Sequence, residues 1–345
     1  MEINRESSPT PSWLDRPLFH SLPHITTYII LIIVLIGLTL FSRFYILGER
    51  VMSHDEVNHV VPSYDLSIGK GYRHDPVTHG PVQFHLVALS YFLFGANDFT
   101  SRIPAALYSV ATVLFVTFGF RRYLGKIGSL IGGYLFLISP YLLFYGRYTR
   151  NEAFVALYAV LTLYAVLRYL EKGEHKMLYL LTAVTALQFA TKETAYIYTA
   201  QLLIFLAFLF MDRIGKARWE NHHARRLFMT LLSGALLLLI FVVILAGWNA
   251  IVNKDSSEIQ QAVGQSFTPI QIIELGGVIV ALVLAVIAVI ILLRNIGWNA
   301  LKQDRSFDML MLIGSLILPL LTAFPVKIIG SLLRQNWNPI DYSPE

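Results

Sequence analysis

The sequence predicts an all-α polytopic membrane protein with about nine transmembrane helices. The 345 residues are 55% hydrophobic and only 14% charged, with a mean hydropathy of +0.58. Apolar stretches near the length of a membrane-spanning helix recur along the chain, and short basic clusters separate them. A soluble fold of this size could not bury that much apolar sequence, so a membrane must cover it.

Seven of the expected spans stand out by length alone. A helix needs about 20 apolar residues to cross ~30 Å of hydrocarbon. The segments of that length are 25–46, 103–120, 128–146, 152–170, 227–248, 270–293 and 307–329. The apolar run 177–211 would reach ~52 Å as a single helix, which is too long for one crossing. It predicts two shorter helices, broken at residues 191–194.

The orientation follows from the basic clusters, because short loops rich in Lys and Arg stay in the cytoplasm. Such clusters follow the spans that end near residues 120, 170, 211 and 293. If all four are cytoplasmic, the N-terminus is cytoplasmic too, and residues 48–102 form a first outer loop. The short apolar segment 81–95 then cannot cross, and it is predicted to be an interfacial or re-entrant helix.

The predicted organisation is a disordered cytoplasmic tail at 1–24, rich in proline, followed by one transmembrane domain at 25–345. We expect a multi-pass protein of the cell membrane whose polar outer loop carries the chemistry. The chain has no cysteine, which excludes disulfides, a thiolate nucleophile and a cysteine metal site. The net charge of +5 does not indicate nucleic acid, because the basic residues sit at span ends.

The outer loop begins with a carboxylate pair, Asp55-Glu56, which is the first candidate for catalysis. A carboxylate there is suited to act as a general base. The alternative is a solvated start of a loop. The functional interpretation gains weight because long connections without structure are usually functional or disordered, and apolar residues at helical spacing predict a surface helix here.

The end of the same loop contains His74-Asp75-Pro76 and His79-Gly80-Pro81. A histidine beside a turn can donate a hydrogen bond to an anion or bind a divalent metal. No cofactor is certain from the sequence. Hydrogen-bonding histidines are the simpler account, and Asp55, His74 and His79 are the candidate ligands if a metal is present.

Four outer-face cations are candidates for binding a phosphate. Arg147 and Arg150 would share one face of a helix, and paired guanidinium groups suit a phosphate, although snorkelling to lipid headgroups is the alternative. Lys192, in Lys192-Glu193, lies at the predicted helix break, where charged residues mark a functional site or simply pair with each other. Arg102 has the same ambiguity.

These residues together suit group transfer from a lipid phosphate. A glycosyl donor used outside the cytoplasm would be anchored to a polyprenyl phosphate, because nucleotide donors are scarce there. The phosphate leaving group needs positive charge, and the acceptor hydroxyl needs a base.

Five motifs in order carry a resemblance to a known superfamily. They are His54-Asp55-Glu56, Tyr72-x-x-Asp75-Pro76-x-x-His79-Gly80-Pro81, Arg102-x-Pro104, Ser139-Pro140 through Tyr145-Gly146-Arg147-Tyr148-Thr149-Arg150-Asn151-Glu152, and Thr191-Lys192-Glu193. This set resembles the GT-C glycosyltransferases of the protein O-mannosyltransferase and aminoarabinose transferase branch. It is most similar to the family named for flippase-activity-associated proteins of archaeal glycosylation, which has bacterial members.

The resemblance implies a GT-C-like helical bundle and a role for each motif. Asp55 takes the position of the catalytic acidic residue, which would act as the base, with Glu56 beside it, and His79 takes a donor-phosphate position. The other donor-phosphate candidates are Arg102, Arg147, Arg150 and Lys192. The supporting residues are His54, Tyr72, His74, Asp75, Glu152 and Glu193.

The leading hypothesis is an inverting membrane glycosyltransferase that moves a sugar from a polyprenyl-phosphate carrier to a hydroxyl on the outer face, in protein or cell-envelope glycosylation. Its partners would be the lipid-linked sugar, membrane lipids and a second membrane protein, with no nucleic acid. One alternative is translocation of a lipid-linked sugar. Another is a non-catalytic subunit that binds such lipids.

Overall fold

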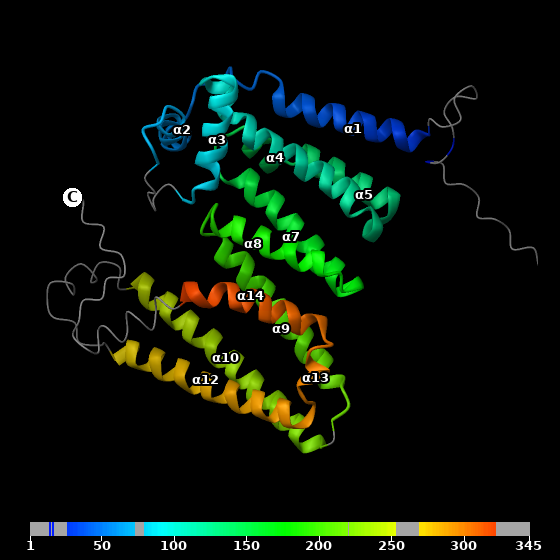
Figure 1. Ribbon diagram of the computed structural model, residues 1–345, viewed down its shortest axis with the longest axis vertical. Coiled ribbons are helices and arrows are strands. Elements are labelled where there is room, and N and C mark those ends of the chain that lie inside the picture. The colour runs from blue at the N-terminus through cyan, green and yellow to red at the C-terminus, as the bar shows by residue number, and fades with distance from the viewer. Residues whose placement is uncertain are drawn as a thin grey trace, which may run out of the picture. The chain divides into compact units, whose positions relative to one another are not determined.

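The computed structural model describes Leu14, Arg16 and residues 26–72, 79–219, 221–252 and 269–321. These residues form thirteen helices and no strand (Figure 1). The chain divides into two compact units, Met1–Ala200 and Gln201–Glu345, which are described separately. The tail predicted at 1–24 lies almost entirely outside the described residues, and the single transmembrane domain at 25–345 stays a prediction.

Six of the described helices are long and apolar enough to cross a membrane. This confirms the predicted class, an all-α polytopic membrane protein. The six stretches are Thr27–Phe44 (α1), Asp98–Gly119 (α4), Glu152–Lys172 (α7), Ala195–Lys216 (α9), His222–Trp248 of α10 (His222–Val252) and Ile272–Asn295 of α12 (Pro269–Asn295). The other three predicted spans correspond to α5 (Arg121–Ile138), α8 (His175–Phe189) and α14 (Arg305–Leu321), and the total of nine stays a prediction.

The first unit is a layer of helices with two short helices at one end. Helices α1, α4 and α5 lie side by side, α7 packs on α4, and α8 packs on α7 (Figure 1). Leu35, Val113 and Leu130 form one buried cluster between α1, α4 and α5. Phe154, Tyr158 and Val184 form part of a second cluster, between α7, α8 and α4.

The loop 48–102 contains the two helices that the sequence predicts there. Helix α2 (His54–Ser67) begins at Ser53, which forms a capping box with Glu56. Helix α3 (Val82–Phe94) has 13 residues and so a length of about 20 Å, which is too short to cross the hydrocarbon. This agrees with the prediction that 81–95 does not cross.

Two predicted boundaries were wrong. Helix α4 begins at Asp98 rather than 103, because Asn97 caps it by accepting a hydrogen bond from the Thr100 backbone N–H. The predicted span 128–146 is interrupted at Ser139, where Pro140 starts the separate helix α6 (Pro140–Tyr145). A residue before proline is disfavoured in helical geometry, which accounts for the break.

The predicted break at 191–194 is confirmed, because α8 ends at Phe189 and α9 begins at Ala195. The end of the loop 48–102 is anchored at this break by two backbone hydrogen bonds of 3.1 Å, from Gly80 to Thr191 and from Val82 to Ala190. A Cβ on Gly80 would lie 2.2 Å from the carbonyl oxygen of Ala190. Glycine is therefore required at position 80 for this close approach.

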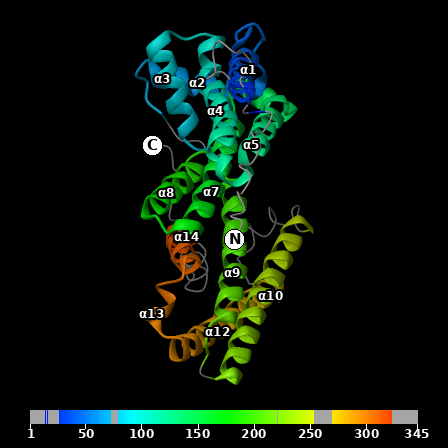
Figure 2. The same cartoon turned by 90° about the vertical axis from the view of Figure 1, so that its right-hand side faces the viewer.

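The second unit is built on α10 and α12, which lie side by side (Figure 1, Figure 2). Phe210, Phe228 and Leu292 are part of its buried cluster, which also receives Leu301 from the short helix α13 (Trp298–Leu301). The candidate site residues that the sequence predicts all belong to the first unit.

Candidate active site

The N-terminus of α2 is joined to the segment before α7 by an ion pair. Arg150 donates from Nη1 to Asp55 Oδ2 at 2.7 Å. Asp55 is 52% exposed, and its other carboxylate oxygen accepts no hydrogen bond from any described residue. The structure therefore brings the loop carboxylate together with Arg150 of the Arg-x-x-Arg motif, and no described residue binds the second carboxylate oxygen.

The ion pair continues into a four-residue network of alternating charge. Arg150 Nε lies 3.8 Å from Glu152 Oε2, and Lys192 Nζ donates to Glu152 Oε1 at 2.7 Å. Glu152 and Lys192 are only 11% and 16% exposed. The network Asp55–Arg150–Glu152–Lys192 thus connects α2, the start of α7 and the turn between α8 and α9.

His79 and Glu193 form a second pair beside this network. His79 Nδ1 lies 2.7 Å from Glu193 Oε2, which leaves Nε2 as the other hydrogen-bonding atom of the ring. The backbone φ of His79 is 71°, a left-handed conformation that is uncommon outside glycine and often marks a functional position. Lys192 and Glu193 therefore do not pair with each other, since each binds a residue from elsewhere in the chain.

His59 lies against the ring of His79 in the interior of the first unit. The two rings are nearly parallel with centroids 6.2 Å apart, and His59 is 3% exposed. The pKa of His59 is lowered to about 4, mainly by burial and additionally by repulsion from His79 and Arg150. The Nδ1 atom of His59 is buried without a hydrogen-bond partner among the described residues.

Glu56 differs sharply from its neighbour Asp55, because it is fully buried and fully paired. Its carboxylate accepts five hydrogen bonds, two from Arg102 and one each from Arg50, Ser53 and Thr149. Burial opposes ionisation, but the hydrogen bonds from Arg102, Thr149 and Ser53 outweigh it, and the pKa of Glu56 lies below its ordinary value.

Arg102 is also completely buried. Besides its bonds to Glu56, it donates from Nη1 to the carbonyl oxygens of Leu47 at 2.8 Å and Arg50 at 2.9 Å. Its guanidinium therefore has no surface with which to contact a ligand in this state.

Arg147 lies away from Arg150, contrary to the expectation that they share a helix face. The segment 146–151 is a series of turns between α6 and α7, so helical spacing does not apply. Arg147 donates at 2.7 Å to the carbonyl oxygens of Ser42 and Tyr45, at the C-terminal end of α1.

The remaining predicted residues are placed as follows. His54 is the exposed first residue of α2, and Tyr72 packs its ring against Phe84 and His85. His74 and Asp75 lie outside the described residues. Within the described part of the chain, no three His, Asp or Glu side chains are placed to hold a metal, so a metal at Asp55, His74 and His79 stays an untested alternative.

Sequence reasoning missed three contributors. The contact between Ser53 and Glu56 was predictable, because Ser-x-x-Glu is a capping-box signature. Arg50 follows the first span on the side predicted to be outer, where an arginine is as unusual as Arg147 and Arg150 are. Thr149 gave no signal, because it contributes only through its backbone N–H.

Comparison with families of known proteins finds a match for part of the chain. A family model described as dolichyl-phosphate-mannose-protein mannosyltransferase matches residues 78–248. No curated protein and no solved structure matches the chain. The family is of the GT-C type, and it supports a membrane glycosyltransferase of the mannosyltransferase kind that works with a lipid-linked sugar. The predicted resemblance to the GT-C glycosyltransferases is thus confirmed over residues 78–248, where the chain is similar to the dolichyl-phosphate-mannose-protein mannosyltransferase family.

Proposed function

We propose that the protein transfers a sugar from a polyprenyl-phosphate carrier to an acceptor hydroxyl on the outer face of the cell membrane, with Asp55 as the general base. The observation that carries this proposal is the Asp55–Arg150 pair, which presents an exposed carboxylate beside a cation in a chain similar to GT-C enzymes.

The proposed step is a single displacement with inversion. The acceptor oxygen forms a bond to the anomeric carbon of the sugar while its proton passes to Asp55. The bond between that carbon and the phosphate oxygen breaks, and the electron pair leaves with the polyprenyl phosphate. Asp55 suits this role because Arg150 holds Oδ2 in place while the other oxygen stays open to accept a hydrogen bond.

The leaving phosphate requires positive charge and hydrogen bonds. Arg150 and Lys192 supply the charge, and His79 offers a ring nitrogen for a hydrogen bond. Arg150, Lys192 and His79 come from three separate segments, and each binds a carboxylate of the protein. A phosphate arriving among them would share these donors with Asp55, Glu152 and Glu193. Fixed donors of this kind stabilise developing charge without reorganisation, which is how such sites lower a barrier.

Glu56 and Arg102 have a different role in this proposal. Because both are buried and bound to each other, they hold the surrounding segments in place and do not contact the donor. The prediction that Arg102 binds phosphate is therefore replaced by a positioning role.

The decisive experiment is Asp55→Asn, assayed for transfer from a polyprenyl-phosphate sugar by the purified full chain. We expect turnover to fall by about 10²–10⁴-fold, the usual range for removal of a general base. Asp65→Asn is the matched control. Asp65 lies in the same helix and pairs with exposed Lys70 at 2.9 Å, so turnover should stay unchanged.

Unchanged turnover in Asp55→Asn would remove Asp55 from the mechanism. Movement of a lipid-linked sugar across vesicle membranes without any transfer would instead favour translocation, the alternative that the sequence leaves open.

A further inference from the structure

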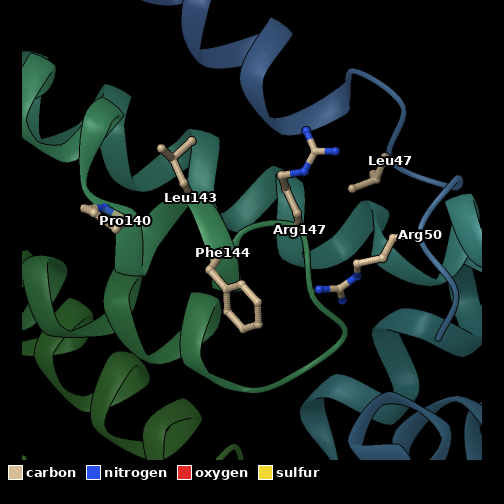
Figure 3. A pocket seen from close by; sticks show the side chains of 6 residues that line it. All are labelled: Leu47, Arg50, Pro140, Leu143, Phe144 and Arg147. Atoms are coloured by element: carbon tan, nitrogen blue, oxygen red, sulfur yellow. The ribbon is translucent and has the colours of Figure 1, made fainter. Parts of the chain in front are cut away.

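A separate cavity of about 300 Å³ lies between α6 and the connection that follows α1. It is lined by Leu47, Arg50, Pro140, Leu143, Phe144 and Arg147. Figure 3 shows the two arginine side chains at this cavity, with Arg50 and Leu47 coming from one segment and the other four residues from α6 and the turn after it. None of these six residues belongs to the Asp55–Arg150–Glu152–Lys192 network.

The surroundings of this cavity carry an excess of positive charge. Arg147 Nη1 donates to the carbonyl oxygen of Ser42, and Arg43 Nη1 donates to the hydroxyl of the same residue. On the other side, Arg50 and Arg102 share the carboxylate of Glu56. Among the described residues, Glu56 is the one carboxylate in an ion pair with any of these four arginines.

The four guanidinium groups thus have one ion-paired carboxylate between them, which leaves an excess of positive charge without an ion-pair partner among the described residues. The C-terminal carbonyls of α1 that bind Arg147 offset about half a charge through the helix dipole. Burial lowers the pKa of Arg147, and repulsion from Arg102 and Arg50 lowers it further. Uncompensated charge beside a membrane is costly, so the region favours a bound anion.

The lining also indicates what kind of anion fits. Four of the six lining residues are apolar, namely Leu47, Pro140, Leu143 and Phe144. Arg50 is held in place by stacking on the rings of Tyr148 at 4.8 Å and Phe144 at 5.5 Å. A planar, fixed guanidinium suits a phosphate, and an apolar wall beside it suits a hydrocarbon chain attached to that phosphate.

We propose that this cavity binds the phosphate group of a lipid, at a site distinct from the one that contains Asp55. Arg50 and Arg147 contact the phosphate, and the apolar lining residues contact the first part of the lipid chain. The site is independent of sugar transfer, so it stands or falls separately from the proposed function.

Native mass spectrometry of the purified full chain provides the test, with polyprenyl monophosphate, phosphatidylglycerol and inorganic phosphate as three separate probes. Arg147→Gln should bind one fewer lipid at saturation, or bind it about tenfold more weakly, which is roughly 1.4 kcal/mol. Leu143→Trp retains every arginine and fills the cavity, so it should give the same loss. Arg122→Gln, which removes an exposed arginine paired with Glu171, is the control and should bind as the unaltered chain does.

The three probes identify the source of the phosphate. Binding of either lipid with loss in both variants supports the site, and the tighter lipid identifies its occupant. Inorganic phosphate that binds as tightly as the lipids would overturn the lipid assignment, and unchanged lipid binding in Arg147→Gln and Leu143→Trp would overturn the site. Asp55→Asn should retain this lipid, so a failure here is distinguishable from a failure of the transfer mechanism.

Discussion

Thr149 donates its backbone N–H to Glu56 Oε1 at 3.1 Å, one residue away from the ion pair between Arg150 and Asp55. The same two segments are therefore joined twice, once through a buried carboxylate and once through an exposed one. The two carboxylates have the same charge and adjacent positions, but only the exposed one has an oxygen that no described residue binds. Burial thus separates a structural role from a chemical one within a single dipeptide.

The first prediction concerns this division of roles. Glu56→Gln should lower the free energy of unfolding by about 3–5 kcal/mol, because it leaves Arg102 buried without its counter-charge. Asp55→Asn should lower it by about 1 kcal/mol or less, since its ion pair is largely exposed. Unfolding in a denaturing detergent titration measures both. Equal losses in the two variants would contradict the division.

The second prediction concerns pH and His59. His59 has a pKa of about 4 in the folded protein, against an ordinary value of 6.5, so the unfolded state binds the proton more tightly. The contribution of His59 to stability should therefore be nearly constant above about pH 7 and fall by up to about 3 kcal/mol as the pH drops towards 4. The groups that act on His59 are His79, Arg150, Glu152 and Asp55.

His59→Phe provides the control for this effect. It keeps an aromatic ring against Phe84 and removes the titrating group. Unfolding measured between pH 7 and pH 5 should lose most of its pH dependence in this variant. A slope that persists at full size would assign the effect to other groups.

The third prediction concerns the partly buried pair of Glu152 and Lys192. Glu152→Gln should be more destabilising than Lys192→Gln, because Glu152 also lies 3.8 Å from Arg150 and so keeps a cation when Lys192 is removed. A double-mutant cycle should give a coupling energy of about 1–3 kcal/mol. The exposed pair of Lys216 and Asp212 should couple by less than about 1 kcal/mol. Similar coupling in both pairs would show that burial at the site is unimportant.

The fourth prediction concerns Gly80. Gly80→Ala should destabilise the first unit and reduce transfer, because the new methyl group would overlap the carbonyl of Ala190 and push His79 away from Glu193. Gly37→Ala is the matched control, since nothing lies within 4 Å of a Cβ there. Thermal unfolding and transfer assays compare the two variants. If Gly80→Ala behaves like Gly37→Ala, the close contact does not constrain the site.

The helical fold could be predicted largely from the sequence, because apolar run length determines where a membrane helix can form. The break at 191–194 was predictable for the same reason, since 35 residues exceed one crossing. The start of α4 was not, because an Asn97 cap adds residues that a hydropathy pattern assigns to a loop. The stop at Ser139 depends on one proline inside an otherwise continuous apolar run.

The candidate site was predictable as a set of residues but not as a set of contacts. Charged residues outside the basic clusters are conspicuous in an apolar chain, so Asp55, Arg150 and Lys192 could be singled out. Their pairing depends on the turns at 146–151, which also send Arg147 to the end of α1 instead. Sequence spacing carries that information only inside a regular helix.

The two backbone hydrogen bonds from 80 and 82 to 191 and 190 also have a mechanical consequence. His79 is anchored directly to the turn that carries Lys192 and Glu193, so these side chains cannot drift apart independently. A sugar phosphate that displaces the histidine from its carboxylate would pull on the start of α9 as well. Binding of the sugar phosphate at the loop would then change the position of a membrane helix through these main-chain hydrogen bonds. Most side-chain substitutions would leave the hydrogen bonds in place.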